Sequence, residues 1–270
     1  MTVRILFGHA ALQVVAGALG VDVLHIKGPA TDPDLQSAGG GTDADVLVRP
    51  SQCEAFLLAM TARDWQRRNT FRSGSPFGHA ATYWHPQWGY ADVHRFFPGM
   101  GQDEQTFDVL WAERQTRDFA GIPAAVPSPG ARHLVAVLNA ARNRRPLPSD
   151  SDAAAAGAAL VLVPRVRAEV GWAAAHGTLD ERLGAPDYAL WKVTVEGGTR
   201  TQEWWARVKA APTRRDKVAL VLRAPLVNVD HLANVRGHRP TAREIVVEFF
   251  DRPRRGLAEE WQRRTTRGSR

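Results

Sequence analysis

The amino-acid sequence predicts an α+β fold, with a small mixed β-sheet and flanking helices followed by a mainly helical C-terminal part. Segments of the first hundred residues follow one another in the order helix, strand, strand, helix, strand, strand, which differs from a regular βαβ series. A stretch rich in Pro, Gly and Ala comes next, at residues 121–131. Most periodic stretches after it have helical spacing. We therefore expect an α+β domain at residues 1–120 and a mainly helical domain at residues 131–270.

The first elements have clear local signals. Residues 2–19 place apolar side chains near one helical face, which predicts a helix. Residues 21–28 form a short apolar run that ends in Lys-Gly, typical of a strand that meets a loop. The loop at residues 29–42 is rich in Pro, Asp and Gly, and residues 43–48, with the sequence DADVLV, predict a second strand.

The next elements are a helix and a hairpin. Ser51 and Glu54 match a capping box, so a helix should begin near Ser51. Segments 79–86 and 89–97 flank a short turn and predict two paired strands. The aromatic cluster YWHPQW at residues 83–88 could stack a base, but we expect it to pack in the turn and core.

The remaining chain has mainly helical patterns. Residues 187–198 have strand propensity and could interrupt the helical series. The helices expected after the hairpin lie at residues 103–115, 131–143, 152–175, 200–210, 214–222 and 241–263.

Composition limits the cellular context and the partners. The net charge of +7 comes almost wholly from arginine and would attract polyanions such as RNA, DNA or nucleotides. A preference for Arg over Lys, with abundant Ala and Gly, also follows from GC-rich coding. Cys53 is the only cysteine, which excludes a disulfide within the chain and fits a reducing cytoplasm. No run of eighteen apolar residues is present, so we expect no transmembrane helix and no membrane partner.

The two aspartates at the start of the second predicted strand are the first candidate site. Side chains alternate along a strand, so Asp43 and Asp45 share one face, with Cα atoms roughly 6.6 Å apart. Without a counter-ion they would repel each other, and one would take up a proton at a raised pKa. A divalent cation such as Mg²⁺ removes this conflict. Helix capping or a solvated strand end is the alternative explanation for the pair.

A third acid strengthens the metal interpretation. In the segment GYADVHRFF, Asp92 shares one strand face with Tyr90 and His94. If this strand neighbours residues 43–48, three carboxylates meet on one side of the sheet. Such a group suits two metal ions that clamp the attacking and leaving oxygens in phosphoryl transfer.

These residues resemble the polymerase-beta-like minimal nucleotidyltransferase superfamily. More narrowly, they resemble a bacterial family of uncharacterised nucleotidyltransferases with a pattern LKG, DIDLLV and DLHW, here IKG, DADVLV and DVHRF. The resemblance covers residues 20–120 and extends more loosely into the helical remainder. It implies the nucleotidyltransferase fold and a metal-dependent enzyme. Such an enzyme transfers NMP from an NTP such as ATP to an acceptor hydroxyl and releases pyrophosphate.

The resemblance also implies roles for single residues. Asp43, Asp45 and Asp92 would bind Mg²⁺ or Mn²⁺, and Asp92 would help to deprotonate the attacking group. Lys27 would pair with a phosphate, and Gly28 would let the backbone approach the triphosphate. In this scheme His94 would touch the substrate or pack.

Two departures from the family pattern support an alternative function. The glycine motif Gly28-Pro29 lies fifteen residues before Asp43 instead of about ten, and the arginine that usually precedes the paired acids is missing. Gly40 and Gly41 could replace it by binding phosphate through backbone N–H groups. The alternative is a catalytically inactive binding or scaffold protein with this fold. The sequence leaves open the oligomeric state and whether the acceptor is RNA, a protein side chain or a small metabolite.

Overall fold

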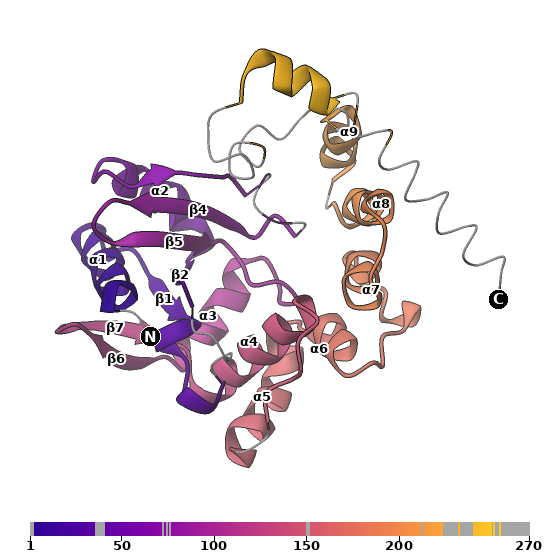
Figure 1. Cartoon of the computed structure of the whole chain (residues 1–270). Helices are drawn as coiled ribbons and strands as arrows, with labels where there is room; N and C mark the ends of the chain where they lie inside the picture. The colour runs from indigo at the N-terminus through magenta and orange to yellow at the C-terminus, as the bar shows by residue number, and fades with distance from the viewer. Residues whose placement is uncertain are drawn as a thin grey trace. The chain divides into compact units, whose positions relative to one another are not determined.

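The structure is a computed structural model of the 270-residue chain (Figure 1). The described residues are 3–35, 41–71, 73, 75, 77–149, 152–211, 213–223, 232, 240–249, 251 and 254. The chain forms two compact units, residues 1–178 and residues 179–270. Among the described residues, strands occur only in the first unit.

A five-stranded mixed sheet forms the centre of the first unit. Its strands lie in the order β1-β2-β5-β4-β3. β2 and β5 pair in parallel, whereas all other neighbours pair antiparallel. The strands are β1 Val23–Ile26, β2 Asp43–Val48, β3 Gln66–Arg67, β4 Ala80–His85 and β5 Gly89–His94.

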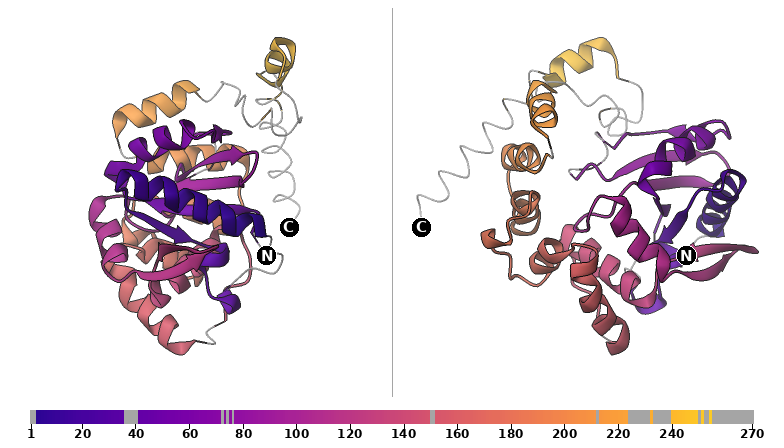
Figure 2. Two further views of the ribbon diagram at one scale, coloured as in Figure 1. Left: turned by 90° about the vertical axis from the view of Figure 1, so that its left-hand side faces the viewer. Right: turned by 180° about the vertical axis from the view of Figure 1, so that it is seen from behind.

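Two helices cover one face of this sheet, because alternate residues of the strands are apolar. α1, at Val3–Leu19, lies across the strands in the left panel of Figure 2, and α2 spans Cys53–Thr61. The shared core includes Leu12, Phe56, Ala44, Val46, Val48, Ala91 and Val93. The residues between these apolar strand positions therefore face the other side, among them Asp45 and Asp92.

A helix and a second hairpin follow the sheet. α3, at Glu104–Ala112, begins at Asp103, whose side chain accepts a hydrogen bond from the backbone N–H of Thr106. Strands β6, Gln115–Phe119, and β7, Ile122–Val126, then pair antiparallel. Residues 121–131, whose Pro, Gly and Ala content is typical of a linker, instead form β7 and the start of α4. A two-stranded hairpin tolerates proline at its edges, and it buries the alternate apolar residues of β7.

Three helices complete the first unit. They are α4 at Pro129–Arg142, α5 at Ala153–Arg165 and α6 at Glu169–Ala175, and α4 packs against both of the others. The single helix predicted at residues 152–175 is divided, because Arg167 adopts a positive φ of 53° between α5 and α6.

The second unit is helical wherever the structure describes it. Its helices are α7 at Tyr188–Glu196, α8 at Arg200–Ala210 and α9 at Arg214–Arg223. Thr199 and Gln202 form the capping box of α8. The strand propensity at residues 187–198 is overridden in α7, where the neighbours Leu190 and Trp191 are both buried on a helical face.

The predicted fold class is confirmed: a mixed sheet with flanking helices precedes a helical C-terminal part. The predicted capping box at Ser51 was wrong. α2 begins after a 3₁₀ turn at Pro50–Gln52, and the backbone N–H of Ser51 instead donates to Glu104 at 2.6 Å. The helix predicted at residues 241–263 is present at residues 242–249, and most of its remainder lies outside the described residues. No helix in the described part of the chain has the length and apolarity needed to cross a membrane.

Candidate functional site

The parallel pairing of β2 and β5 brings two acids together. Asp45 stands opposite Asp92 in the register, and Asp43 stands opposite Tyr90. Cross-strand partners point to the same face of a sheet, so the carboxylates of Asp45 and Asp92 project side by side, away from α1 and α2. The strand of Asp92 therefore neighbours the strand of Asp43 and Asp45, which is the condition for these acids to meet on one side of the sheet.

Asp45 is held by two donors that meet at one of its oxygens. Lys27 Nζ lies 2.6 Å from Asp45 Oδ1, and His94 Nε2 lies 2.9 Å from the same atom. Burial acts to raise the pKa of Asp45, but the charge of Lys27 and the hydrogen bond from His94 outweigh it, and the pKa falls well below its usual range. Asp45 is therefore ionised at neutral pH.

Asp92 has a different environment. Thr82, opposite it on β4, donates from Oγ1 to Asp92 Oδ1 at 2.6 Å, and Asn69 Nδ2 donates to Thr82 Oγ1 at 2.9 Å. Burial, and then the charge of Asp45, raise the pKa of Asp92 from 3.8 to about 6, although the Thr82 hydrogen bond opposes this shift. The two acids thus differ in proton affinity, as groups with different roles in proton transfer often do.

Lys27 is held in an unusual backbone conformation beside these acids. Its φ is 59° and its ψ is −178°, a region that residues other than glycine rarely occupy. Gly28 follows with a φ of 46°, where glycine is the favoured residue. Strained backbone of this kind is concentrated at functional sites, and here it aims an ammonium group at Asp45.

The other predicted site residues lie less centrally or cannot be placed. Asp43 is half-buried at the start of β2, and Thr42 Oγ1 donates to its Oδ1. Gly41 is exposed, and Gly40 lies outside the described residues. His94 is fully buried, and burial followed by the charge of Lys27 lowers its pKa to about 4.

The donor set fits a hard divalent cation. Single ligand atoms of Asp45, Asp92 and His94 all lie within 4.8 Å of one another. Each acid also keeps one oxygen, Oδ2, that receives no hydrogen bond from the described residues. Carboxylate oxygens are the ligands that Mg²⁺ and Mn²⁺ prefer, so Asp45 and Asp92 could hold such an ion with these free oxygens.

Sequence reasoning missed the residues that support the acids. Thr82 had a usable signal, because it lies in the predicted hairpin strand that pairs with the strand of Asp92, and the observed register sets the two residues opposite each other. Arg142 and His79 had none: Arg142 Nη1 lies 2.5 Å from His79 Nε2 across 63 residues of sequence. Burial lowers the pKa of Arg142, and the charges of Asp45 and Asp92 oppose that shift, so the guanidinium lies within electrostatic reach of both acids.

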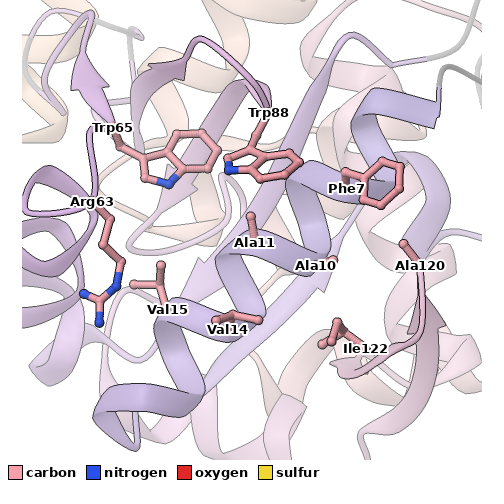
Figure 3. Close-up of a pocket in the computed structure, with 10 residues that line it drawn as sticks. All are labelled: Phe7, Ala10, Ala11, Val14, Val15, Arg63, Trp65, Trp88, Ala120 and Ile122. Atoms are coloured by element: carbon pink, nitrogen blue, oxygen red, sulfur yellow. The ribbon is translucent and has the colours of Figure 1, made fainter.

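A separate apolar cavity of about 350 Å³ lies on the side of the sheet covered by α1 (Figure 3). Trp65 and Trp88 lie side by side along one edge, and Arg63 lies at one end. Trp88 also stacks on buried His85, so the expected packing role of the aromatic cluster at residues 83–88 holds for this pair. Because α1 stands between this cavity and the sheet face that carries the acids, the cavity does not belong to the acid site.

Comparisons with known proteins give weak similarities. Neither models of protein families nor curated protein sequences match the chain. Among solved structures, it is similar to the lincosamide antibiotic adenylyltransferase LnuA bound to lincomycin, with a TM-score of 0.35 and 13% identity over 50% of this chain and 85% of that one. It is also similar to an antigenic nucleotidyltransferase-like protein from Paracoccidioides brasiliensis, with a TM-score of 0.34 and 16% identity over 60% of this chain and 76% of that one. Similarity this weak leaves the function to be inferred from the site itself.

Proposed function

We propose that the protein is a metal-dependent nucleotidyltransferase that moves NMP from an NTP to an acceptor hydroxyl. The oxygen of the acceptor forms a bond to the α-phosphorus, the bond from that phosphorus to the bridging oxygen breaks, and pyrophosphate leaves with the electron pair. A bound Mg²⁺ or Mn²⁺ would stabilise negative charge on the phosphate oxygens. The acceptor could be RNA, a protein side chain or a small metabolite.

The observation that carries this proposal is the facing pair of Asp45 and Asp92. Both acids sit on adjacent parallel strands, each with one oxygen fixed by protein donors and one oxygen free. A purely structural carboxylate would be expected to use both oxygens in hydrogen bonds when it is largely buried. We include Asp43 as a further ligand, because it shares the face and begins the same strand.

The remaining residues supply binding and proton transfer in this proposal. Asp92, with its pKa raised to about 6, is suited to take the proton of the acceptor hydroxyl. Once a metal ion compensates the charge of Asp45, the ammonium group of Lys27 leaves that carboxylate and pairs with a phosphate oxygen. Gly28, which has no side chain, lets the nucleotide approach the adjacent backbone.

The test is incubation of the purified protein with each α-labelled NTP, Mg²⁺ or Mn²⁺, and cell extract. We expect one class of acceptor to become labelled, and Asp45→Asn and Asp92→Asn to abolish labelling. Asp64→Asn is the matched control, because Asp64 is exposed and its φ of 64° suits asparagine equally well. Labelling should be unchanged in this control.

The same experiment distinguishes the alternative of an inactive binding or scaffold protein. Metal-dependent NTP binding without transfer to any acceptor, with binding lost in Asp45→Asn, would support that alternative. Transfer that persists in both Asp45→Asn and Asp92→Asn would contradict the assignment of the site.

A further inference from the structure

The donors behind Asp92 form an ordered series. Asn69 donates to Thr82 Oγ1, and Thr82 Oγ1 in turn donates to Asp92 Oδ1. Every donor in the series points toward the carboxylate. The series fixes one oxygen of Asp92 and leaves the other free.

A second series runs toward Asp45 from the end of α4. Arg142 Nη1 lies 2.5 Å from His79 Nε2, and a guanidinium group can only donate hydrogen bonds. His79 Nε2 is therefore the acceptor, and the ring proton of His79 is on Nδ1. At the other end, His94 Nε2 lies 2.9 Å from Asp45 Oδ1. The ionised carboxylate can only accept, and it lies closer to this nitrogen than the ammonium of Lys27, which is 3.4 Å away. His94 therefore carries its proton on Nε2 and presents a lone pair at Nδ1.

The two remaining ring nitrogens are complementary. His79 Nδ1 and His94 Nδ1 are both buried, and neither has a hydrogen-bond partner in the part of the chain that the structure describes. The first is a donor and the second an acceptor, and the ring centroids are 5.0 Å apart. Buried polar atoms are rarely left unpaired, and two that match in polarity and lie on adjacent rings can satisfy each other.

We infer that Arg142, His79 and His94 form one hydrogen-bond series that holds Asp45 Oδ1, with His79 Nδ1 donating to His94 Nδ1 directly or through one water molecule. His94 is then a positioning residue and not a metal ligand, because the Nε2 atom that an ion would need carries a proton. The inference rests on the proposed function only in assigning the free Oδ2 of Asp45 to the metal.

Two further observations favour this role. Mg²⁺ and Mn²⁺ prefer oxygen to imidazole, so His94 gains little as a ligand, whereas outer donors that orient ligands matter strongly for metal affinity. A cation at the C-terminal end of α4 is favoured by the helix dipole, but an exposed arginine would interact with that dipole equally well. Arg142 is instead partly buried, with His79 Nε2 and Asn139 Oδ1 as its contacts, both of them neutral groups.

The direct test is the tautomer of each ring, read by NMR of the metal-free full chain with ¹⁵N-labelled histidine near pH 8. We expect the proton on Nδ1 in His79 and on Nε2 in His94. His176, whose Nδ1 lies 2.9 Å from the carbonyl oxygen of Trp172, supplies a reference signal for the Nδ1–H form. A wild-type protein in which His94 carries its proton on Nδ1 would overturn the inference.

Metal affinity gives a second readout. Arg142→Met should weaken Mn²⁺ binding about tenfold, whereas Arg142→Lys, which keeps a donor, should stay within about threefold of wild type. Arg145→Met, an exposed arginine just after the same helix, is the matched control. His94→Gln should likewise retain affinity that His94→Leu loses, because glutamine can donate to Asp45. Equal affinities of Arg142→Met and Arg145→Met, or equal losses in His94→Gln and His94→Leu, would contradict the positioning role.

The two proposals can fail separately. The tautomers are measured without nucleotide or metal, so an absence of nucleotidyl transfer leaves that result intact. Reversed tautomers would remove the hydrogen-bond series while leaving transfer by the Asp45 and Asp92 pair untouched.

Discussion

At the scale of single residues, Asp45 and Asp92 have opposite effects on stability. Above its pKa of about 6, Asp92 carries a negative charge that burial and the charge of Asp45 disfavour. Asp92→Asn should therefore raise the free energy of unfolding near pH 8 by up to about 3 kcal/mol. Below pH 6 the wild-type carboxyl takes up its proton and the gain should shrink. Asp45→Asn removes the charge that Lys27 and His94 face, and should lower the free energy of unfolding by about 2 kcal/mol.

Urea unfolding without metal, near pH 8 and again near pH 5, measures both effects. Asp64→Asn, in an exposed turn, should differ little from wild type at either pH. Changes of the same sign in Asp45→Asn and Asp92→Asn would show that the two carboxylates do not have the separate environments described here.

A buried histidine pair should make the protein sensitive to acid. His9 Nδ1 and His25 Nδ1 lie 2.8 Å apart under Phe119, and burial lowers the pKa of His9 to about 4. Between pH 6.5 and 4 the unfolded chain binds a proton that folded His9 does not. This part of the stability is therefore complete above pH 6.5 and is lost as the pH falls, by up to about 3 kcal/mol. His25, whose pKa is also lowered by burial and by His9, acts in the same direction.

His9→Asn tests this, because asparagine can keep a hydrogen bond near the Nδ1 position without titrating. Between pH 7.5 and 4.5 the free energy of unfolding should decrease in both proteins. We expect the decrease in His9→Asn to be about 2–3 kcal/mol smaller than the decrease in wild type. His176→Asn, at an exposed site, should follow the wild-type curve. A decline in His9→Asn as steep as in wild type would refute the prediction.

Residue patterns anticipated the acid pair but not its surroundings. Alternation along two strands was sufficient to place Asp45 and Asp92 on one face. Like-charge repulsion was expected to raise a pKa within the pair Asp43 and Asp45, whereas the raised pKa belongs to Asp92. The identity of the acid with the raised pKa could not be predicted, because it depends on Lys27 and His94 both lying against Asp45. The contact of Arg142 with His79 depends on where α4 ends relative to β4, which no local pattern encodes.

At the scale of elements, the packing of α4 on α5 depends on one glycine. A Cβ at Gly130 would lie 2.7 Å from the Cβ of Ala158, so Gly130→Ala should lower the free energy of unfolding by about 1–3 kcal/mol. Gly157 lies within α5 and faces open space. Gly157→Ala should raise the free energy of unfolding by about 1 kcal/mol, because alanine favours the helix. Opposite shifts in chemical denaturation are expected, and a stable Gly130→Ala would show that the two helices can separate without cost.

Elements with strong local periodicity were predicted well, and those that tertiary packing decides were not. The strand DADVLV agrees with β2 because its alternation matches what the sheet buries. The first helix agrees with α1 in extent, although Val14 and Leu19 are exposed and Leu12 and Val15 are buried instead. β7 was missed because two of its five residues, Ile122 and Pro123, follow Gly121 and resemble a turn. α7 was ambiguous because its β-branched residues favour a strand until Leu190 and Trp191 are buried on a helix.

At the scale of the whole molecule, fragments can locate the boundary of the folded unit. β7 packs against β1 and α1, and Ala124 and Val126 share a core with Phe119. A fragment of residues 1–178 should therefore unfold cooperatively in urea, whereas residues 1–120, which lack β7, should not. The division predicted from sequence, at 1–120 and 131–270, stays a prediction until this is measured. A cooperative 1–120 fragment would support that division.

The excess charge lies entirely in the second unit. Residues 179–270 contain 19 basic and 12 acidic side chains, whereas residues 1–178 contain 16 of each. Fluorescence anisotropy should show that the full chain binds single-stranded RNA and loses more than about tenfold in affinity between about 50 and 200 mM salt. The 1–178 fragment should bind weakly at either concentration. RNA binding by 1–178 as tight as that of the full chain would contradict this.

The parallel register of β2 and β5 limits how the chain can change in length. Asp45 faces Asp92 only because the residues on either side of each alternate strictly between the acid face and the helix-covered face. One inserted or deleted residue within either strand would turn every later side chain of that strand over, placing an acid under α1 and a core valine in the open. Variation in length should therefore be tolerated in the turn at Pro86–Trp88 and excluded from β2 and β5. A library of single-residue insertions, scored for soluble expression, would show this as one short intolerant window at β2 and another at β5, with the permissive turn directly before β5.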